Sequence, residues 1–156
     1  MPNISRILVP VDFSASSEEA LSFALYLAGN LGASVDVLHV WHHPTYFGPE
    51  VVLHVPGHSQ QTMGQFAQSM ATQEMEKFLA SLDHFGPVRG RGRLEAGDAY
   101  DGIMRVAKEG YDLIVMGTSG RGGIAHVLLG SVADKVVRHA PCAVLTVHAP
   151  GRRPAH

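Results

Sequence analysis

The sequence predicts an α/β protein: one domain built on an open, five-stranded parallel sheet with helices on both faces. Three observations support this prediction. Short apolar segments rich in β-branched residues alternate with segments whose apolar residues recur at helical spacing. The strand segments are apolar at successive positions, as strands covered on both faces are. The 156 residues, 46% of them hydrophobic, suit one domain, expected over residues 1–149 with a polar tail at 150–156.

The first strand is expected at residues 7–11, and a helix follows it. Either Ser14 or Ser16 can cap this helix, with Glu19 as the capping-box partner of Ser16. Gly32 can end the helix in the left-handed conformation. The apolar stripe of the helix comprises Ala20, Leu21, Ala24, Leu27, Ala28 and Leu31.

The second strand is expected at residues 35–41, and an irregular segment follows at residues 42–61. Its three prolines and its length indicate a functional flap or a mobile segment. A helix is expected from Met63 onward. Its core stripe is predicted to comprise Met63, Phe66, Met70, Phe78, Leu79 and Leu82.

The third strand, at residues 88–94, contains two glycines and is therefore expected at a sheet edge, with its alternating arginines in solvent. Asp98 can cap a helix that ends at Gly110. Residues 112–116 form the predicted fourth strand. The last helix is expected to run from Ser131 through His139, with Val132, Val136 and Val137 on one face, and the fifth strand is expected at residues 142–147.

Composition excludes several classes of protein. Charged residues make up 17% and the net charge is −2, so no basic surface for nucleic acid is expected. No apolar run approaches the ~20 residues of a transmembrane helix, and the start of the chain lacks the features of a secretory signal. The single cysteine, Cys142, is interpreted as a core thiol. These observations together predict a cytoplasmic protein that does not associate with membranes.

A glycine-rich segment at residues 117–131 carries the clearest functional signal. It lacks the lysine of a Walker loop, and its match to a dinucleotide fingerprint lacks the acidic strand end that such a site needs. The spacing Gly117-x2-Gly120-x9-Gly130-Ser131 suits a phosphate instead. Gly117 would allow a tight turn, and Gly120 would let a ligand lie against bare backbone.

The end of this segment is expected to start a helix, whose free N–H groups and dipole favour an anion. Ser131 and Asp134 have the spacing of a capping box, and Arg121 is the only nearby cation. Sheets of this kind bind ligands beyond the carboxyl ends of their strands, where the strand order reverses. The loop at residues 12–14 leaves such a strand end, and Asp12 can either bind a ligand or merely cap the first helix.

The motifs ILVPVDFS, VDVLHV, DLIVMGTSGRGG and GSVADKVVRHAPCAVLTV resemble those of the universal stress protein family, in its ATP-binding branch. The resemblance covers almost the whole chain. It implies a Rossmann-like sheet of the adenine nucleotide alpha hydrolase-like kind, a homodimer joined through the last strand, and binding of ATP with slow or no hydrolysis.

The resemblance also implies a set of nucleotide contacts. Asp12 would accept hydrogen bonds from the ribose hydroxyls, Val40 would contact adenine, and the final glycine and its neighbours would surround the phosphates. The implied contacts are Pro10, Val11, Asp12, Val40, Met116, Gly117, Gly120, Arg121, Gly130, Ser131 and Val132.

We therefore expect a regulatory module of the stress response that binds ATP, with Mg²⁺ as an optional companion ion, and that has no catalytic residues. The alternatives are a weak ATPase and a chaperone-like interaction protein that needs no nucleotide. The histidines at positions 42, 43, 54 and 58 raise a metal site as a further alternative. We favour a segment at residues 42–61 that closes over ATP, with Tyr46 and Phe47 covering the base.

Overall fold

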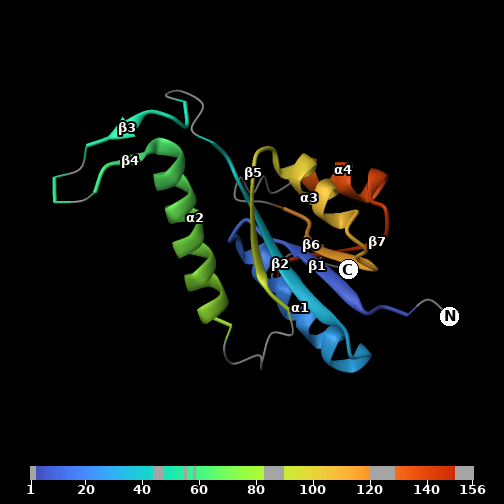
Figure 1. Ribbon diagram of the computed structural model, residues 1–156. Coiled ribbons are helices and arrows are strands. Elements are labelled where there is room, and N and C mark those ends of the chain that lie inside the picture. Colours follow the sequence, from blue (N-terminus) through green and yellow to red (C-terminus); the bar gives the residue numbers. More distant parts are fainter. Residues whose placement is uncertain are drawn as a thin grey trace.

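The computed structural model describes residues 3–43, 48–54, 56–57, 59–82, 90–119 and 129–149. Five strands form one sheet in the order β5-β2-β1-β6-β7 (Figure 1), and every pairing within it is parallel. The predicted fold class is confirmed. The strands are β1 (Arg6–Pro10), β2 (Ser34–Trp41), β5 (Gly92–Ala96), β6 (Leu113–Gly117) and β7 (Ala143–Val147).

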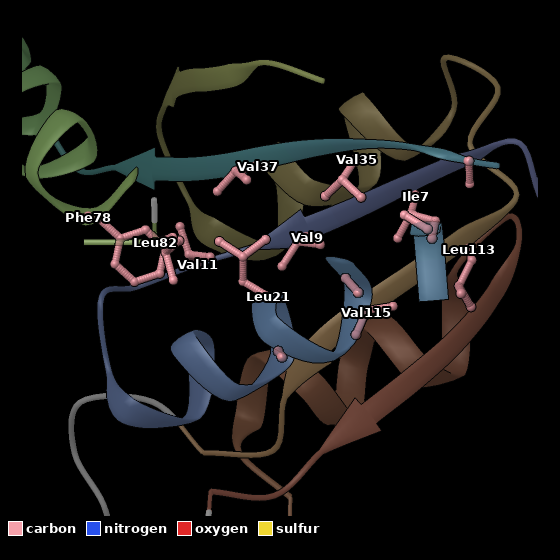
Figure 2. Packing of buried hydrophobic residues seen from close by; sticks show 14 of the residues in the cluster. Ile7, Val9, Val11, Leu21, Val35, Val37, Phe78, Leu82, Leu113 and Val115 are labelled. Carbon is pink, nitrogen blue, oxygen red and sulfur yellow. The ribbon is translucent and has the colours of Figure 1, made fainter. Parts of the chain in front are cut away.

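The sheet is covered on both faces, and each face has its own core. Figure 2 shows the first core, where the helices α1 (Ala15–Leu31) and α2 (Met63–Ala80) pack on residues such as Val9 and Val37. The second core lies under α3 (Ala99–Ala107) and α4 (Ser131–His139) and includes Leu8 and Ile114. Successive residues of one strand therefore enter different cores, which explains why the central strands are apolar at most successive positions.

The ends of α1 decide between the two predicted caps. The Ser14 side chain accepts a hydrogen bond from the Ser17 amide and is the N-cap. The alternative cap at Ser16 is wrong, because Ser16 lies inside the first turn and is 3% exposed. Gly32 ends the helix with φ of 70°, as predicted.

The predicted core stripe of α2 holds only in the second half of the helix. Phe78 and Leu82 are buried, whereas Phe66 and Met70 are 39% and 44% exposed. The first half of α2 extends away from the sheet (Figure 1), and its larger apolar side chains, Phe66 and Met70, do not reach the core. Beside it, β3 (Val52–Leu53) and β4 (Gln61–Thr62) pair antiparallel, so the prediction of a wholly irregular segment was wrong.

The edge position predicted for the third strand of the sheet is confirmed, although β5 begins only at Gly92. Residues 83–89, which include the predicted start of this strand, lie outside the described residues. The prediction that the arginines of this strand lie in solvent is wrong for Arg93. Its side chain is 15% exposed and pairs with Glu109 and Glu95.

The start of α4 also differs from the prediction. Gly130 is the N-cap and Ser131 is the first helical residue, so the predicted capping box of Ser131 and Asp134 is wrong. Asp134 pairs with Arg138 at 3.0 Å instead. Val137, expected on the buried face, is 46% exposed. Within the described part of the chain, none of the helices is long and apolar enough to cross a membrane.

Candidate functional site

A cavity of about 220 Å³ lies at the carboxyl ends of β1, β2 and β6, next to the first turns of α3 and α4. The strand order reverses here, because the chain passes from β1 to β2 on one side and β6 pairs with β1 on the other. Open parallel sheets bind their ligands at this position. The cavity wall includes nine of the predicted site residues: Pro10, Val11, Asp12, Val40, Met116, Gly117, Gly130, Ser131 and Val132.

The other two predicted contacts, Gly120 and Arg121, lie outside the described residues. The structure thus brings together the loop after β1, the end of β2, the end of β6 and the start of α4. Whether these residues contact a nucleotide stays a prediction, since lining a cavity does not identify its ligand.

Asp12 lies in the turn between β1 and α1, and residues at the start of α1 hold it in place. Its Oδ1 accepts hydrogen bonds from the Ser14 amide at 3.1 Å and from the Ser17 hydroxyl at 2.5 Å, and its own amide donates to Ser17 Oγ at 3.0 Å. The N-cap of α1 is Ser14, so capping alone does not explain Asp12. The turn thus holds Asp12 in the cavity wall.

Gly117 is needed for a reason that the sequence did not indicate. A Cβ atom at this position would meet the Ser16 side chain at 2.4 Å and the Ser16 backbone at 2.8 Å. Gly117 therefore allows the start of α1 to pack directly on the end of β6, whereas the prediction assigned it to a tight turn. This close approach brings the β1–α1 turn beside the loop that follows β6.

The first turn of α4 lines the cavity with Ser131, Val132 and Ala133. The Gly130 amide donates to the Thr118 carbonyl, and the first helical hydrogen bond runs from the Asp134 amide to the Gly130 carbonyl at 2.9 Å. The amides of Ser131 and Val132 precede that bond and have no acceptor within the helix. Together with the helix dipole, they make this end of the cavity favourable for an anion.

Another part of the cavity wall is apolar. Gly102 lets α3 approach β2 closely, because a Cβ atom there would meet the Val40 methyl groups at 2.8 and 2.9 Å. Val40 lines the cavity together with Ile103 and Met116. An apolar wall of this kind suits an aromatic ring.

Several residues of the wall were not among the implied nucleotide contacts. The apolar ones lie within the predicted strands and helices, and only the tertiary structure shows that they border the cavity. Of the polar ones, Thr118 and Ser119 belong to the predicted glycine-rich segment, where their hydroxyl groups were expected as donors to a phosphate. These wall residues are Ser17, Leu38, Ala99, Ile103, Thr118, Ser119 and Ala133.

Thr118 connects three parts of the site. Its amide donates to the Val147 carbonyl at 3.1 Å, and its hydroxyl pairs with His148 Nδ1 at 3.0 Å. Its carbonyl accepts from Gly130. The end of β7 thus helps to position the first turn of α4.

The acidic and histidine residues do not gather into an evident metal centre in the described part of the chain. No group of three His, Cys, Asp or Glu residues there could hold a metal ion. Among the described wall residues, Asp12 is the only carboxylate. Of the four histidines considered for a metal site, His58 lies outside the described residues.

The fold is that of an open α/β protein with a cavity at the point where its strand order reverses. The sequence model of the universal stress protein family matches residues 3–148. The chain belongs to this family.

Individual relatives agree with this assignment. A universal stress protein of Methanocaldococcus jannaschii is 31% identical over 145 residues, which cover 93% of this chain and 82% of the relative. The structure of universal stress protein UspA from Lactobacillus plantarum matches with a TM-score of 0.76 at 25% identity, covering 93% of this chain and 98% of that one. A universal stress protein solved in complex with cAMP matches with a TM-score of 0.66 at 26% identity, covering 94% and 99%.

Proposed function

We propose that this chain is a regulatory module of the stress response that binds an adenine nucleotide, foremost ATP, in the cavity at the carboxyl ends of the strands. One observation carries the proposal. A single cavity has an apolar wall formed by Val40, Ile103 and Met116 and, elsewhere on its wall, the first turn of α4 and the Asp12 carboxylate. Base, ribose and phosphate require these three kinds of surface.

The arrangement supports one orientation of the nucleotide. Adenine would lie near Val40 and Met116, the ribose hydroxyls would donate to Asp12, and the phosphates would accept from the amides of Ser131 and Val132. The cAMP complex of a related universal stress protein supports an adenine nucleotide as the ligand class. Asp12 is the residue of the described wall that could also hold Mg²⁺ together with the phosphates.

We propose binding with slow or no hydrolysis, in the cytoplasm. Ser14 and Ser17 already donate hydrogen bonds to the Asp12 carboxylate, which supports a role in orienting the ribose over activation of a water molecule. Phosphate release from ATP by the purified protein distinguishes the alternative of a weak ATPase.

The test of the proposal is to extract and identify the nucleotide that copurifies with the protein, and to compare ATP with adenosine by calorimetry. Two or three charge-assisted hydrogen bonds to phosphate predict at least about tenfold tighter binding of ATP. Equal affinity for ATP and adenosine would contradict the phosphate site. No extracted nucleotide and no binding of either ligand would favour the alternative of an interaction protein that needs no nucleotide.

A variant of the α4 cap sharpens this test. Gly130 has φ of −66° and ψ of 160°, which a valine can adopt, so Gly130→Val should leave the fold intact. The added side chain would stand where the phosphates approach, so ATP affinity should fall far more than adenosine affinity. Gly29→Ala in the distant α1 helix is the matched control, since a Cβ atom there has open space around it.

We also propose a homodimer joined through β7, which lies at the edge of the sheet. The Val147 carbonyl accepts from Thr118, so Val147 and the alternate residue Leu145 direct their backbone groups toward β6. Val144 then directs its amide outward. An apolar edge strand of this kind is expected to pair with another strand.

Two proline variants test the dimer by light scattering. Val144→Pro removes no hydrogen bond within the sheet and should yield a folded monomer. Leu145→Pro removes a bond to β6 and should destabilise the monomer itself. A monomeric mass for the wild-type protein at micromolar concentration would contradict the proposed dimer.

The proposed closure of residues 42–61 over ATP depends on Tyr46 and Phe47, which lie outside the described residues. The described part of this segment contributes no residue to the cavity wall. Limited proteolysis tests the closure: cleavage within residues 42–61 should slow on addition of ATP and should not respond to zinc. Protection by zinc alone would favour the metal alternative.

A further inference from the structure

The β1–α1 turn contains a backbone conformation that its residue type disfavours. Phe13 has φ of 64°, and it is the only described non-glycine residue with a positive φ. In this conformation the Cβ atom crowds the backbone, so bulky residues rarely adopt it. Phe13 directly follows Asp12, the carboxylate of the cavity wall. Unusual backbone conformations persist only where the surroundings enforce them.

Two rings from different elements hold the Phe13 side chain. Its centroid lies 4.3 Å from that of His39, on β2, and 5.3 Å from that of Phe78, on α2, in an edge-to-face arrangement. His39 is itself tied to the turn, because its Nδ1 lies 2.9 Å from the Val11 carbonyl oxygen. Phe78 is 7% exposed and belongs to the core under α1 and α2. Figure 2 shows Phe78 close to Val11 at the end of the strands.

Asp12 and Phe13, although adjacent in the chain, therefore contact different parts of the protein. Asp12 lines the cavity beside α3 and α4, whereas Phe13 packs against the core on the α1 and α2 face. The Asp12 carboxylate is held by Ser14 and Ser17, and the Phe13 ring is held by His39 and Phe78. A shift of α2 that moved Phe78 would act on the residue next to the carboxylate.

We propose that Phe13 is a positioning residue: its ring, held between His39 and Phe78, keeps the turn in the conformation that presents Asp12 to the ribose, so that α2 influences nucleotide affinity. This inference rests on the proposed binding of an adenine nucleotide. It assigns to α2, which contributes no residue to the described cavity wall, an effect on the site.

The first measurement needs no nucleotide. Hydrogen exchange of the Asp12, Ser14 and Ser17 amides reports opening of the turn, because each donates to a side chain within it. Phe13→Gly tolerates the positive φ but removes the ring, and Phe78→Leu removes the ring from the α2 side. Both variants should accelerate exchange of these three amides at least tenfold more than exchange in the centre of β1. Phe66→Leu, at the exposed half of α2, is the control and should change neither.

The second measurement compares ATP with 2′,3′-dideoxy-ATP, which lacks the hydroxyls that Asp12 would accept. The wild-type protein should prefer ATP about tenfold, and both variants should lose most of this preference while keeping their affinity for the dideoxy nucleotide. The positioning role would be overturned if both variants kept the preference for ATP. It would also be overturned if exchange of the turn amides were accelerated no more than exchange in the centre of β1. If the wild-type protein binds neither nucleotide, the proposed function fails, and the exchange result alone decides whether Phe13 holds the turn.

Discussion

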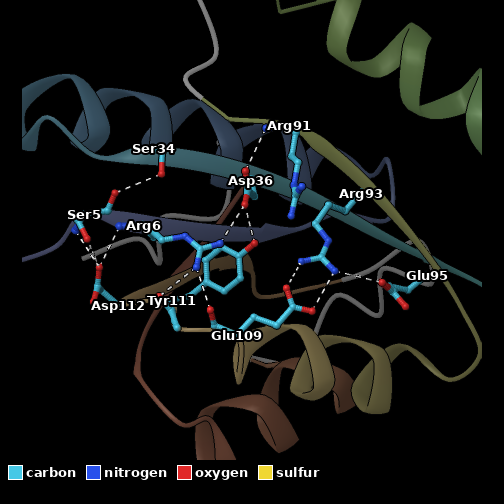
Figure 3. Close-up of polar contacts among 11 residues, drawn as sticks. Ser5, Arg6, Ser34, Asp36, Arg91, Arg93, Glu95, Glu109, Tyr111 and Asp112 are labelled. Carbon is cyan, nitrogen blue, oxygen red and sulfur yellow. Dashed lines mark hydrogen bonds and ion pairs between the residues drawn. The ribbon is translucent and has the colours of Figure 1, made fainter.

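At the amino ends of the sheet strands, charged side chains bind one another (Figure 3), whereas at the carboxyl ends polar groups border a cavity. Asp36 is 8% exposed and accepts hydrogen bonds from the Tyr111 hydroxyl at 2.6 Å and the Arg91 amide at 3.0 Å. Arg6 lies 3.6 Å from the same carboxylate and stacks over the Tyr111 ring. The buried carboxylate is thus satisfied entirely by its own chain.

The charged residues next to this cluster are likewise bound by groups of the same chain. Arg93 forms two hydrogen bonds with Glu109 and a third with Glu95. The Arg93 guanidinium lowers the pKa of Glu109, and Glu109 in turn raises the pKa of Arg93. Burial, followed by the hydrogen bond to Asp36, raises the pKa of Tyr111.

The contrast shows what separates a structural polar cluster from a candidate binding site. Both ends of the sheet contain a carboxylate held by hydroxyl and amide donors. At Asp36 the carboxylate is buried, and it is bound by Tyr111 and Arg6 of the same chain. At Asp12 the neighbouring space is a cavity of about 220 Å³. Changes at the amino ends should therefore affect stability alone, and changes at the carboxyl ends should affect ligand binding as well.

The largest effect is expected for Gly117→Ala. The added methyl group would overlap the Ser16 backbone, so the start of α1 must move away from β6. We expect a loss of about 3 kcal/mol or more in the free energy of unfolding, measured in urea, together with loss of ATP binding. Gly29→Ala should instead stabilise the protein by about 0.5–1 kcal/mol, because it adds a helix-favouring residue in open space. Unchanged stability of the Gly117 variant would contradict the close packing.

Asp36→Ala should separate the two ends of the sheet. It leaves the buried Tyr111 hydroxyl and the Arg91 amide without their acceptor. The expected loss of stability is about 2–3 kcal/mol. Under conditions where the variant is fully folded, its affinity for ATP should change less than about threefold. Tyr111→Phe removes one of these bonds and should cost about 1 kcal/mol. A parallel fall in affinity would show that the two ends are coupled.

Ser14→Ala tests the carboxyl end with a smaller perturbation. Loss of the α1 cap should cost about 1 kcal/mol and should also weaken ATP binding, because the Ser14 amide and hydroxyl belong to the turn that fixes Asp12. Thr62→Ala removes the cap of α2, far from the cavity wall, at a similar cost in stability. Calorimetry at a temperature where both variants are folded should show weaker binding only for Ser14→Ala.

The smallest effect is expected at Asp112, at the amino ends. The Ser5 and Arg6 amides and the Ser5 hydroxyl donate to its carboxylate and lower its pKa. A lowered pKa in the folded state contributes stability above the ordinary value of about 3.9, and this contribution is lost as the pH falls through the folded value. Asp112→Asn should therefore be less stable than wild type at neutral pH, and the difference should shrink in acid. A difference that does not depend on pH would contradict the assignment.

Much of the fold could be predicted from the sequence, because it depends on the spacing of apolar residues and on interactions between residues close together in the chain. The apolar strands and the helical stripes indicated the parallel sheet with two cores. Gly32 and Asp98 were recognised as helix ends because a left-handed conformation and a side-chain cap act within a few residues. Nine predicted site residues lie around one cavity, since the carboxyl ends of parallel strands meet at one edge.

Other features depend on contacts between distant segments, and only the tertiary structure decided them. Phe66 and Met70 are exposed because the first half of α2 extends away from the sheet. The helical periodicity of the sequence does not indicate how far the sheet reaches along the helix. Gly117 is required by Ser16, about a hundred residues earlier in the chain. The conformation of Phe13 is held by rings from β2 and α2. A sequence pattern records which residues prefer burial or a given turn, but the neighbour that fills or leaves a space is set only when the elements pack.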